Sequence, residues 1–207
     1  RTGSPSPTWR RLAGCGWGHL PAHAGAGLHA PEEAATLAKH RISQCVYSLE
    51  YARELSHYAV EAGATVHIHV KIDTGMSRLG FFWRRTGGRD SDQMAGCAAS
   101  RPGGGGLFTH FSDADGSEEY TMGSSPNSWT PSRSGGPGIT FQICHCASSA
   151  AVLHYPCTHL DMVRPGIALY GYYPAEELRG LDGPGLEPVM TVKSRISAVR
   201  ALPKVPM

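Results

Sequence analysis

The sequence predicts an α/β protein with an incomplete (β/α) barrel, in which only the later strands are present. Short apolar strands alternate with helical segments, which is typical of parallel βα units. Each strand ends in polar or glycine-rich residues, as in barrels that carry their functional groups at the strand ends. Five barrel-type strands can be counted, starting at Ile42. A complete barrel has eight strands in roughly 250 residues.

The elements can be assigned in order from residue 31 onward. Helical features cover Pro31–His40, where a proline and two acidic residues suit a first turn. A short strand follows at Ile42–Ser48. Apolar residues at helical spacing then predict a helix over Leu49–Ala62 that ends at Gly63. Alternating residues predict the next strand at Val66–Lys71.

The second half of the sequence contains further short apolar segments between glycine-rich stretches. We expect strands at Leu107–Phe111, Ile139–Cys146 and His159–Gly166, the last leading into Ile167–Gly171. Residues Pro188–Val199 are also strongly β-like. Each of the three expected strands leads into polar or small residues, so their ends are the places to look for chemistry.

Glycine and proline are unevenly distributed along the chain. The 26 glycines and 15 prolines concentrate in residues 1–31, 84–106 and 123–138, which we interpret as irregular. The second and third of these stretches stand where barrel helices are expected. One hypothesis is a reading-frame shift that later restores itself, and the nucleotide sequence would test it.

Composition excludes several classes of function. The net charge of +2 is too small to indicate a nucleic-acid partner or an anionic membrane. No apolar run approaches the roughly 18 residues needed to span a bilayer, and no signal peptide is visible. The six cysteines form no regular framework, which favours free thiols in a reducing cytoplasm.

Several residues at the expected strand ends could carry chemistry. Arg164, followed by Pro-Gly166-Ile167, could hold a planar acceptor while bare backbone N–H groups face an anion. Small residues with hydroxyls, Ser148 and Ser149, could cradle a phosphate at a helix start. A surface arginine and an ordinary helix N-cap explain the same residues without a ligand.

Three further candidates are Lys71, Arg78 and His110. Arg78 could bind a carboxylate through two parallel hydrogen bonds, and His110 could contact a neighbouring arginine or a cofactor ring. Solvated charges at a strand end and a packed histidine remain open as alternatives. A metal site is disfavoured because alternation places His67 and His69 on the same face of a strand and the sequence contains no C-x2-C pair, so we expect no metal. The residues considered for it are His67, His69, Cys144–Cys146, His154, Cys157 and His159.

Four segments, taken in order, closely resemble alanine racemases. They are Lys71–Phe81 (KIDTGMSRLGF), Leu107–Asp115 (LFTHFSDAD), His145–Ala151 (HCASSAA) and Asp161–Gly171 (DMVRPGIALYG). The resemblance implies a fold-type III enzyme that uses pyridoxal 5′-phosphate (PLP) to interconvert L- and D-alanine, supplying D-alanine for peptidoglycan. It further implies a cytoplasmic homodimer of two-domain subunits, each with a barrel and a C-terminal β-domain, and no nucleic-acid or membrane partner.

The resemblance also implies roles for individual residues. Arg164 would hydrogen-bond the pyridine nitrogen of PLP, and His110 would support Arg164. Arg78 would help to hold the substrate carboxylate and the phenolic oxygen of PLP, and Lys71, carbamylated in some members, would position Arg78. The phosphate would lie against a set of four positions: Ser148 (usually asparagine in the family), Ser149, Gly166 and Ile167.

The two bases of the family's reaction are not identifiable in this sequence. One is a Schiff-base lysine on the first barrel strand, and the other is a tyrosine from the partner subunit's β-domain. No lysine precedes Lys39, which lies in a predicted helix. We therefore predict a truncated, inactive form of the enzyme. Alternatives are an active variant that uses Lys71 or Lys193, and a non-catalytic fragment that binds PLP or interferes with dimers.

The chain is predicted to consist of three parts. Residues 1–30 are predicted to be irregular, with no family match. Residues 31–187 are predicted to form the partial PLP-binding barrel. Residues 188–207 are predicted to begin the connection to a C-terminal β-domain that is missing from this sequence.

Overall fold

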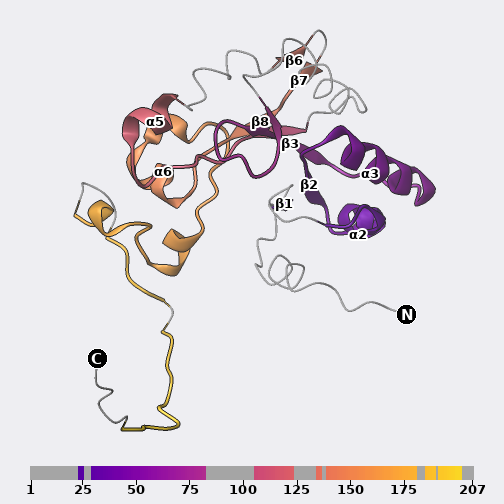
Figure 1. Cartoon of the computed structure of the whole chain (residues 1–207). Coiled ribbons are helices and arrows are strands. Elements are labelled where there is room, and N and C mark those ends of the chain that lie inside the picture. The colour runs from indigo at the N-terminus through magenta and orange to yellow at the C-terminus, as the bar shows by residue number, and fades with distance from the viewer. Residues whose placement is uncertain are drawn as a thin grey trace, which may run out of the picture.

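The computed structural model describes residues 23–25, 29–82, 105–123, 134–136, 139–180, 185–189 and 191–201. The central element is a parallel sheet with strand order β1-β2-β3-β5-β8 (Figure 1). Its strands are β1 (His23–Gly25), β2 (Ile42–Val46), β3 (Ile68–Asp73), β5 (Gly106–Phe108) and β8 (Ile143–His145). The short β4 (Phe81–Phe82) also pairs with β3. The predicted α/β class with parallel strands is confirmed.

Helices connect these strands. A 3-10 turn, η1 (Pro31–Glu33), leads into α2 (Ala34–Lys39), and α3 (Leu49–Glu61) joins β2 to β3. Figure 1 shows α2 and α3 side by side next to β2, with α5 (Glu118–Gly123) and α6 (Ser149–His154) near the other end of the sheet. The other described elements are the antiparallel pair β6 (Ser134–Gly136) and β7 (Ile139–Thr140), and the 3-10 turns η3 (Pro156–Thr158), η4 (Ile167–Tyr170) and η5 (Glu176–Leu178).

Helix α3 follows the sequence prediction because its start and its buried side are locally encoded. The Ser48 hydroxyl accepts a hydrogen bond from the Tyr51 N–H at 3.2 Å, which satisfies one of the free amides of the first turn. Leu55 and Ala59 are buried as predicted, whereas Ala62 is exposed and Tyr51 is buried instead.

The sheet has one apolar side and one polar side. Residues at the same register position in neighbouring parallel strands project to the same face, and the next position projects to the opposite face. Val46, Val70, Leu107 and Cys144 share one register position and belong to the hydrophobic core together with Leu55 and Ala59 of α3. The next position holds Lys71, Phe108 and His145, which lie outside that core cluster.

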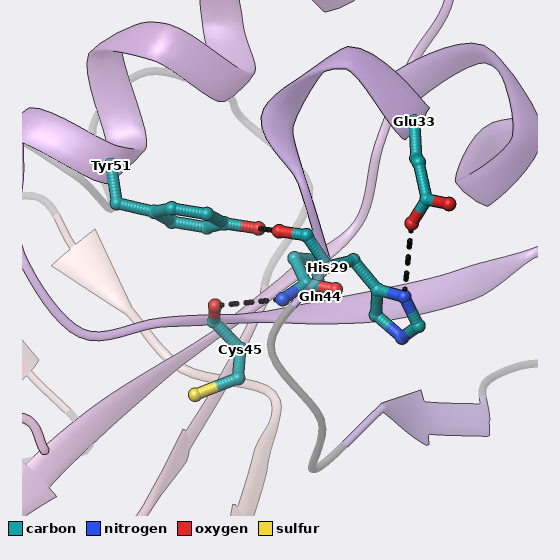
Figure 2. A network of polar contacts seen from close by, with 5 residues as sticks. All are labelled: His29, Glu33, Gln44, Cys45 and Tyr51. Carbon is teal, nitrogen blue, oxygen red and sulfur yellow. Dashed lines mark hydrogen bonds and ion pairs between the residues drawn. The ribbon is translucent and has the colours of Figure 1, made fainter. Parts of the chain in front are cut away.

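A polar network fixes the segment before α2 against α3 and lies beside β2 (Figure 2). The Tyr51 hydroxyl donates to the backbone oxygen of His29 at 2.8 Å, and Nδ1 of His29 lies 3.1 Å from a Glu33 carboxylate oxygen. On the neighbouring strand, the Gln44 side-chain amide donates to the Cys45 backbone oxygen at 3.2 Å. These contacts bury polar groups with partners, which stabilises the entry into the sheet.

The structure corrects several predicted strands. β1 lies inside residues 1–30, which we predicted to be irregular, and it pairs in parallel with β2. β3 starts two residues later than predicted because its pairing with β2 begins at Ile68. The segment predicted as one strand at 139–146 consists of β7, paired with β6, and β8, paired with β5. Most of the residues in 84–106 and 123–138 lie outside the described part.

Residues 159–166 do not form the predicted strand. Two backbone bonds join the segment to β8 and to the residues just after it: Asp161 N–H to Cys144 O at 3.1 Å, and Arg164 N–H to Ala147 O at 2.9 Å. However, the Asp161 carboxylate accepts the Cys144 N–H at 2.8 Å, where a ladder would use a backbone carbonyl. Leu160 has a positive φ of 49°, which also breaks an extended run.

The predicted strand at 188–199 is also wrong within the described residues. A strand needs a neighbouring strand for its backbone groups, and this segment is extended and leaves the folded part of the chain (Figure 1). It makes a backbone hydrogen bond from Val189 N–H to Tyr170 O at 3.0 Å. Val192, Ile196 and Val199 are each more than 80% exposed. β propensity alone therefore did not produce a strand.

Candidate active site

The polar side of the sheet forms the floor of a site at the C-terminal ends of β3, β5 and β8. Lys71, Phe108 and His145 occupy one register position on these strands and are all buried. The His145 ring stacks on the Phe108 ring, with centroids 4.8 Å apart and an interplanar angle of 7°. Nζ of Lys71 lies 5.8 Å from the same ring centroid, within cation–π range.

Arg164 reaches over this floor and connects the C-terminal ends of β5 and β8. Its Nη1 donates to Nδ1 of His145 at 2.7 Å, and its Nη2 donates to the Thr109 backbone oxygen at 2.8 Å. Nη2 also lies 3.2 Å from the Cys146 backbone oxygen and 3.4 Å from Nδ1 of His110. Two of the predicted site residues, Arg164 and His110, are thus neighbours joined by a long hydrogen bond.

The hydrogen bonds of Arg164 leave donors available for a ligand. A guanidinium has five N–H groups. The acceptors on His145, Thr109, Cys146 and His110 occupy one Nη1–H and both Nη2–H groups. The Nε–H and the second Nη1–H have no acceptor in the part of the chain that the structure describes. A ring nitrogen that accepts one hydrogen bond fits these free donors.

The predicted phosphate positions also lie together. The Ser149 hydroxyl oxygen accepts the Gly166 N–H at 2.8 Å and the Ala168 N–H at 3.2 Å. Ile167 lies between these two residues, so its backbone N–H belongs to the same loop. Because the hydroxyl accepts both bonds, its own proton remains to be donated to an anion. Ser148 precedes α6 as its N-cap, without a side-chain capping bond.

The structure does not join Arg78 to this group. Arg78 is exposed and lies in the loop after β3, where the Asp73 carboxylate accepts the N–H groups of Gly75 at 2.9 Å and Ser77 at 3.0 Å. No hydrogen bond or ion pair links its side chain to Lys71 or Arg164 within the described residues. Nζ of Lys71 donates to the Ile72 backbone oxygen at 3.4 Å.

Burial and mutual repulsion shift the pKa values of the basic groups. Burial lowers the pKa of Arg164 to about 10, so it remains charged at neutral pH, and burial also lowers the pKa of Lys71. The pKa of His110 is lowered to about 4 by burial and by the charges of Arg164, Arg78 and Lys71. Three cations therefore act on one point of the site, which favours an anionic ligand.

Two more histidines lie behind Arg164. Burial, followed by the charge of Arg164, lowers the pKa of His145 to about 2 and that of His69 to about 4. Burial raises the pKa of the Cys45 thiol to about 11 and that of Cys146 to about 12, so both thiols stay protonated.

These histidine pKa values predict that acid destabilises the chain. His69 and His145 stay neutral in the folded state, while the unfolded chain takes up protons below its ordinary histidine pKa of about 6.5. Stability is unaffected by these groups above that pH. It falls as pH decreases toward 4, by at most about 1.4 kcal/mol per pH unit for each histidine. Urea unfolding at pH 7 and pH 5 measures the loss, and a His69→Asn variant should lose less. Equal stability at both pH values would contradict the assignment.

Four residues that the structure places at or behind Arg164 were not singled out for this role from sequence: His69, Phe108, Thr109 and His145. His69 and His145 were considered only as metal ligands, although the alternation of β3 placed His69 on the same face as Lys71. Alternation was expected to place His67 on the same face of the strand as His69, but His67 precedes β3 and is exposed. Within the described residues, no group of three or more His, Cys, Asp or Glu side chains is arranged to hold a metal ion.

A parallel β/α sheet with ligand-binding groups at the strand ends is the arrangement of barrel enzymes. Comparison with known proteins identifies the class. A family model described as "Alanine racemase, N-terminal domain" matches residues 20–174, and it begins before the domain start predicted at residue 31. The chain therefore belongs to the alanine racemase family.

Individual relatives agree with this family. The alanine racemase of Desulforamulus reducens is 35% identical over 176 residues, covering 84% of this chain and 47% of that protein. The alanine racemase of Methanococcus maripaludis is 36% identical over 180 residues, which cover 86% of this chain and 48% of that protein. The solved structure of the alanine racemase of Clostridium difficile 630 in complex with cycloserine matches with a TM-score of 0.70 and 32% identity. The match covers 82% of this chain and 46% of that one.

The chain spans about half the length of the curated relatives that it matches. Alanine racemases are PLP-dependent isomerases, and the match covers their N-terminal barrel domain. None of the helices in the described part of the chain combines the length and apolar character needed to cross a membrane.

Proposed function

We propose that this chain binds PLP at the C-terminal ends of β3, β5 and β8. The observation that carries the proposal is the arrangement of Arg164, which is held by four acceptors and keeps two N–H donors free within the described residues. Arg164 would donate to the pyridine nitrogen, and its pKa of about 10 supports donation without full proton transfer to the ring. His110 would support Arg164.

On the phosphate side, the Ser149 hydroxyl and the Ile167 backbone N–H would donate to the anion, and Gly166 would let the anion approach the backbone. Ser148 would lie beside it at the start of α6. The bonds from Gly166 and Ala168 to the Ser149 hydroxyl tie the loop to α6 and support a preformed site. PLP in such a site supplies an electron sink for the α-carbon of an amino acid. Arg78, in the loop after β3, would bind the substrate carboxylate, and Lys71 would position Arg78.

The proposed substrate is alanine. We further propose that the complete enzyme is a cytoplasmic homodimer that supplies D-alanine for peptidoglycan. Family membership supports these proposals. Within these 207 residues no lysine precedes Lys39, and Lys39 lies exposed in the last turn of α2, so none of them stands where the family has its PLP-bonding lysine. We therefore propose that a polypeptide of these 207 residues binds PLP without racemising alanine.

The expected result with the purified chain is saturable PLP binding and no D-alanine from L-alanine. Equilibrium dialysis measures the binding, and chiral chromatography measures D-alanine. Borohydride reduction in the presence of PLP, followed by peptide mapping, should label no lysine stoichiometrically. Appearance of D-alanine, or labelling of Lys71 or Lys193, would instead support an active variant. Absence of PLP binding would overturn the proposal.

A second candidate function is interference with dimers of a complete racemase. The observation that favours it is the set of exposed apolar side chains near the end of the described chain: Ile167, Leu169, Tyr170, Val189, Val192, Ile196 and Val199. Apolar surfaces of this kind favour association. Mixing the chain with a complete alanine racemase and measuring mass by light scattering tests this. A mixed complex would support it, and independent species would exclude it.

A further inference from the structure

A continuous hydrogen-bonded chain runs from Arg164 through His145 to His69. Nη1 of Arg164 lies 2.7 Å from Nδ1 of His145, and Nε2 of His145 lies 2.7 Å from Nδ1 of His69. The two imidazole centroids are 4.9 Å apart at 54°. His145 is 0% exposed and His69 is 3% exposed, so water does not replace these bonds. His69 and His145 are 76 positions apart and meet through the pairing of β3 and β8 with β5, and Arg164 reaches His145 from the segment after α6.

Only one arrangement of protons fits this chain. Arginine donates and never accepts, so Nδ1 of His145 must accept and carries no proton. The single proton of neutral His145 is therefore on Nε2, from which it is donated to Nδ1 of His69. Nδ1 of His69 accepts in turn, which leaves the proton of His69 on its Nε2. The direction of donation is Arg164 to His145 to His69.

We propose that His69 is a positioning residue for the PLP site: by accepting the Nε2 proton of His145, it fixes the tautomer and ring orientation that hold Arg164 toward the cofactor. The inference rests on the proposed PLP site. In a neutral histidine, the bond made by one ring nitrogen determines the state of the other. Without an acceptor at position 69, the proton of His145 can move to Nδ1. The Nδ1–H group would then face the Nη1–H group of Arg164, and two donors do not form a hydrogen bond.

The packing around the two rings supports a fixed geometry. Phe108 stacks on His145 at 4.8 Å, which restricts rotation of that ring. Gly106 is the register partner of His69 on β5, and a Cβ added there would overlap the His69 ring. The absence of a side chain at Gly106 therefore provides the space that the His69 ring occupies. Supporting residues behind a binding group commonly determine its orientation in this manner.

The tautomers can be measured on the chain without PLP. Two-bond ¹H–¹⁵N correlation spectra of ¹⁵N-histidine-labelled chain at pH 7 distinguish the tautomers, and loss of a signal in His145→Gln assigns His145. We expect the Nε2–H form for both His145 and His69. In His69→Asn, the side-chain oxygen can take the place of Nδ1, so His145 should keep its tautomer. In His69→Leu, which offers no acceptor, the His145 signals should shift toward a mixture.

An Nδ1–H form of His145 in the unmodified chain would overturn the proposal. So would identical His145 signals in the His69→Leu variant and the unmodified chain. If His69→Leu fails to fold, the unmodified chain and His69→Asn still decide the tautomer.

A second measurement connects the tautomer to the ligand. Equilibrium dialysis should show PLP binding about tenfold weaker in His69→Leu and nearly unchanged in His69→Asn. Equal PLP affinity in all three proteins would overturn the positioning role. If no variant binds PLP, including the unmodified chain, the proposed function fails, whereas the tautomer spectra still report on the Arg164–His145–His69 chain.

Discussion

Replacing Arg164 with lysine will weaken PLP binding by roughly ten- to a hundredfold, because charge-assisted hydrogen bonds contribute about 1.5–3 kcal/mol each and tenfold corresponds to about 1.4 kcal/mol. Lysine keeps the charge but not the planar fork that joins His145 to Thr109 and Cys146. Equilibrium dialysis with PLP measures the affinity.

The same substitution will lower the free energy of unfolding by about 2–4 kcal/mol, because buried acceptors lose their donors. The Thr109 side chain and the His145 ring are fully buried, so water does not replace the guanidinium at this end of the sheet. Urea unfolding at pH 7 measures this loss.

Arg179 provides a matched control for the Arg164 substitution. Its side chain is 65% exposed, and its ion pair with Glu176 at 3.3 Å lies on the surface. Arg179→Lys should change stability by less than about 0.5 kcal/mol and leave PLP affinity unaltered. If Arg164→Lys behaves like Arg179→Lys in both measurements, Arg164 does not organise the site and the assignment of the pyridine contact is wrong.

Replacing Gly106 with alanine will lower the free energy of unfolding by about 3 kcal/mol. The new Cβ would overlap Nδ1, Cε1 and Cγ of the His69 ring. That ring cannot withdraw without breaking its 2.7 Å bond to His145, and both rings are buried. The cost therefore combines overpacking with loss of a buried hydrogen bond. Urea unfolding followed by circular dichroism measures the difference from the unmodified chain.

Two comparisons isolate the cause. Gly123 ends α5 and has no heavy atom within 4 Å of an added Cβ, so Gly123→Ala should cost less than about 0.5 kcal/mol. A double-mutant cycle with His69→Ala removes the ring that the Cβ meets. In that background, Gly106→Ala should cost less than about 1 kcal/mol. An undiminished cost would show that the His69 ring is not what Gly106 accommodates.

The locally encoded parts of the fold were predictable from sequence. The helix over Leu49–Ala62 carries its own N-cap, apolar spacing and terminal glycine, and the structure places α3 at Leu49–Glu61. β2 also falls within its predicted range. By contrast, Pro188–Val199 has strong β propensity, yet it is extended and exposed where described. A strand forms only when a neighbouring strand pairs with it, and the β propensity of one segment does not specify that neighbour.

The candidate site was only partly predictable. The motif around Arg164 identified the family of the chain and marked Arg164 as a candidate site residue. Ser149 and Gly166 were both expected at the phosphate, and the structure places them in contact. The support behind Arg164 was not expected, because His145 and His69 were considered only as metal ligands. His69 and His145 are separated by 76 positions, and only pairing of β3 and β8 with β5 brings them together.

The sequence by itself determined the family of this protein and the α/β class, because short motifs and local periodicity carry that information, and it supplied the residues that we propose to meet PLP. The tertiary structure decided how Arg164 is held. It placed Lys71, Phe108 and His145 in one register position, made room for His69 over Gly106, and left the residues before Arg164 outside the strand ladder. These relations depend on the register between strands distant in the chain, a property of the folded sheet and not of any single segment.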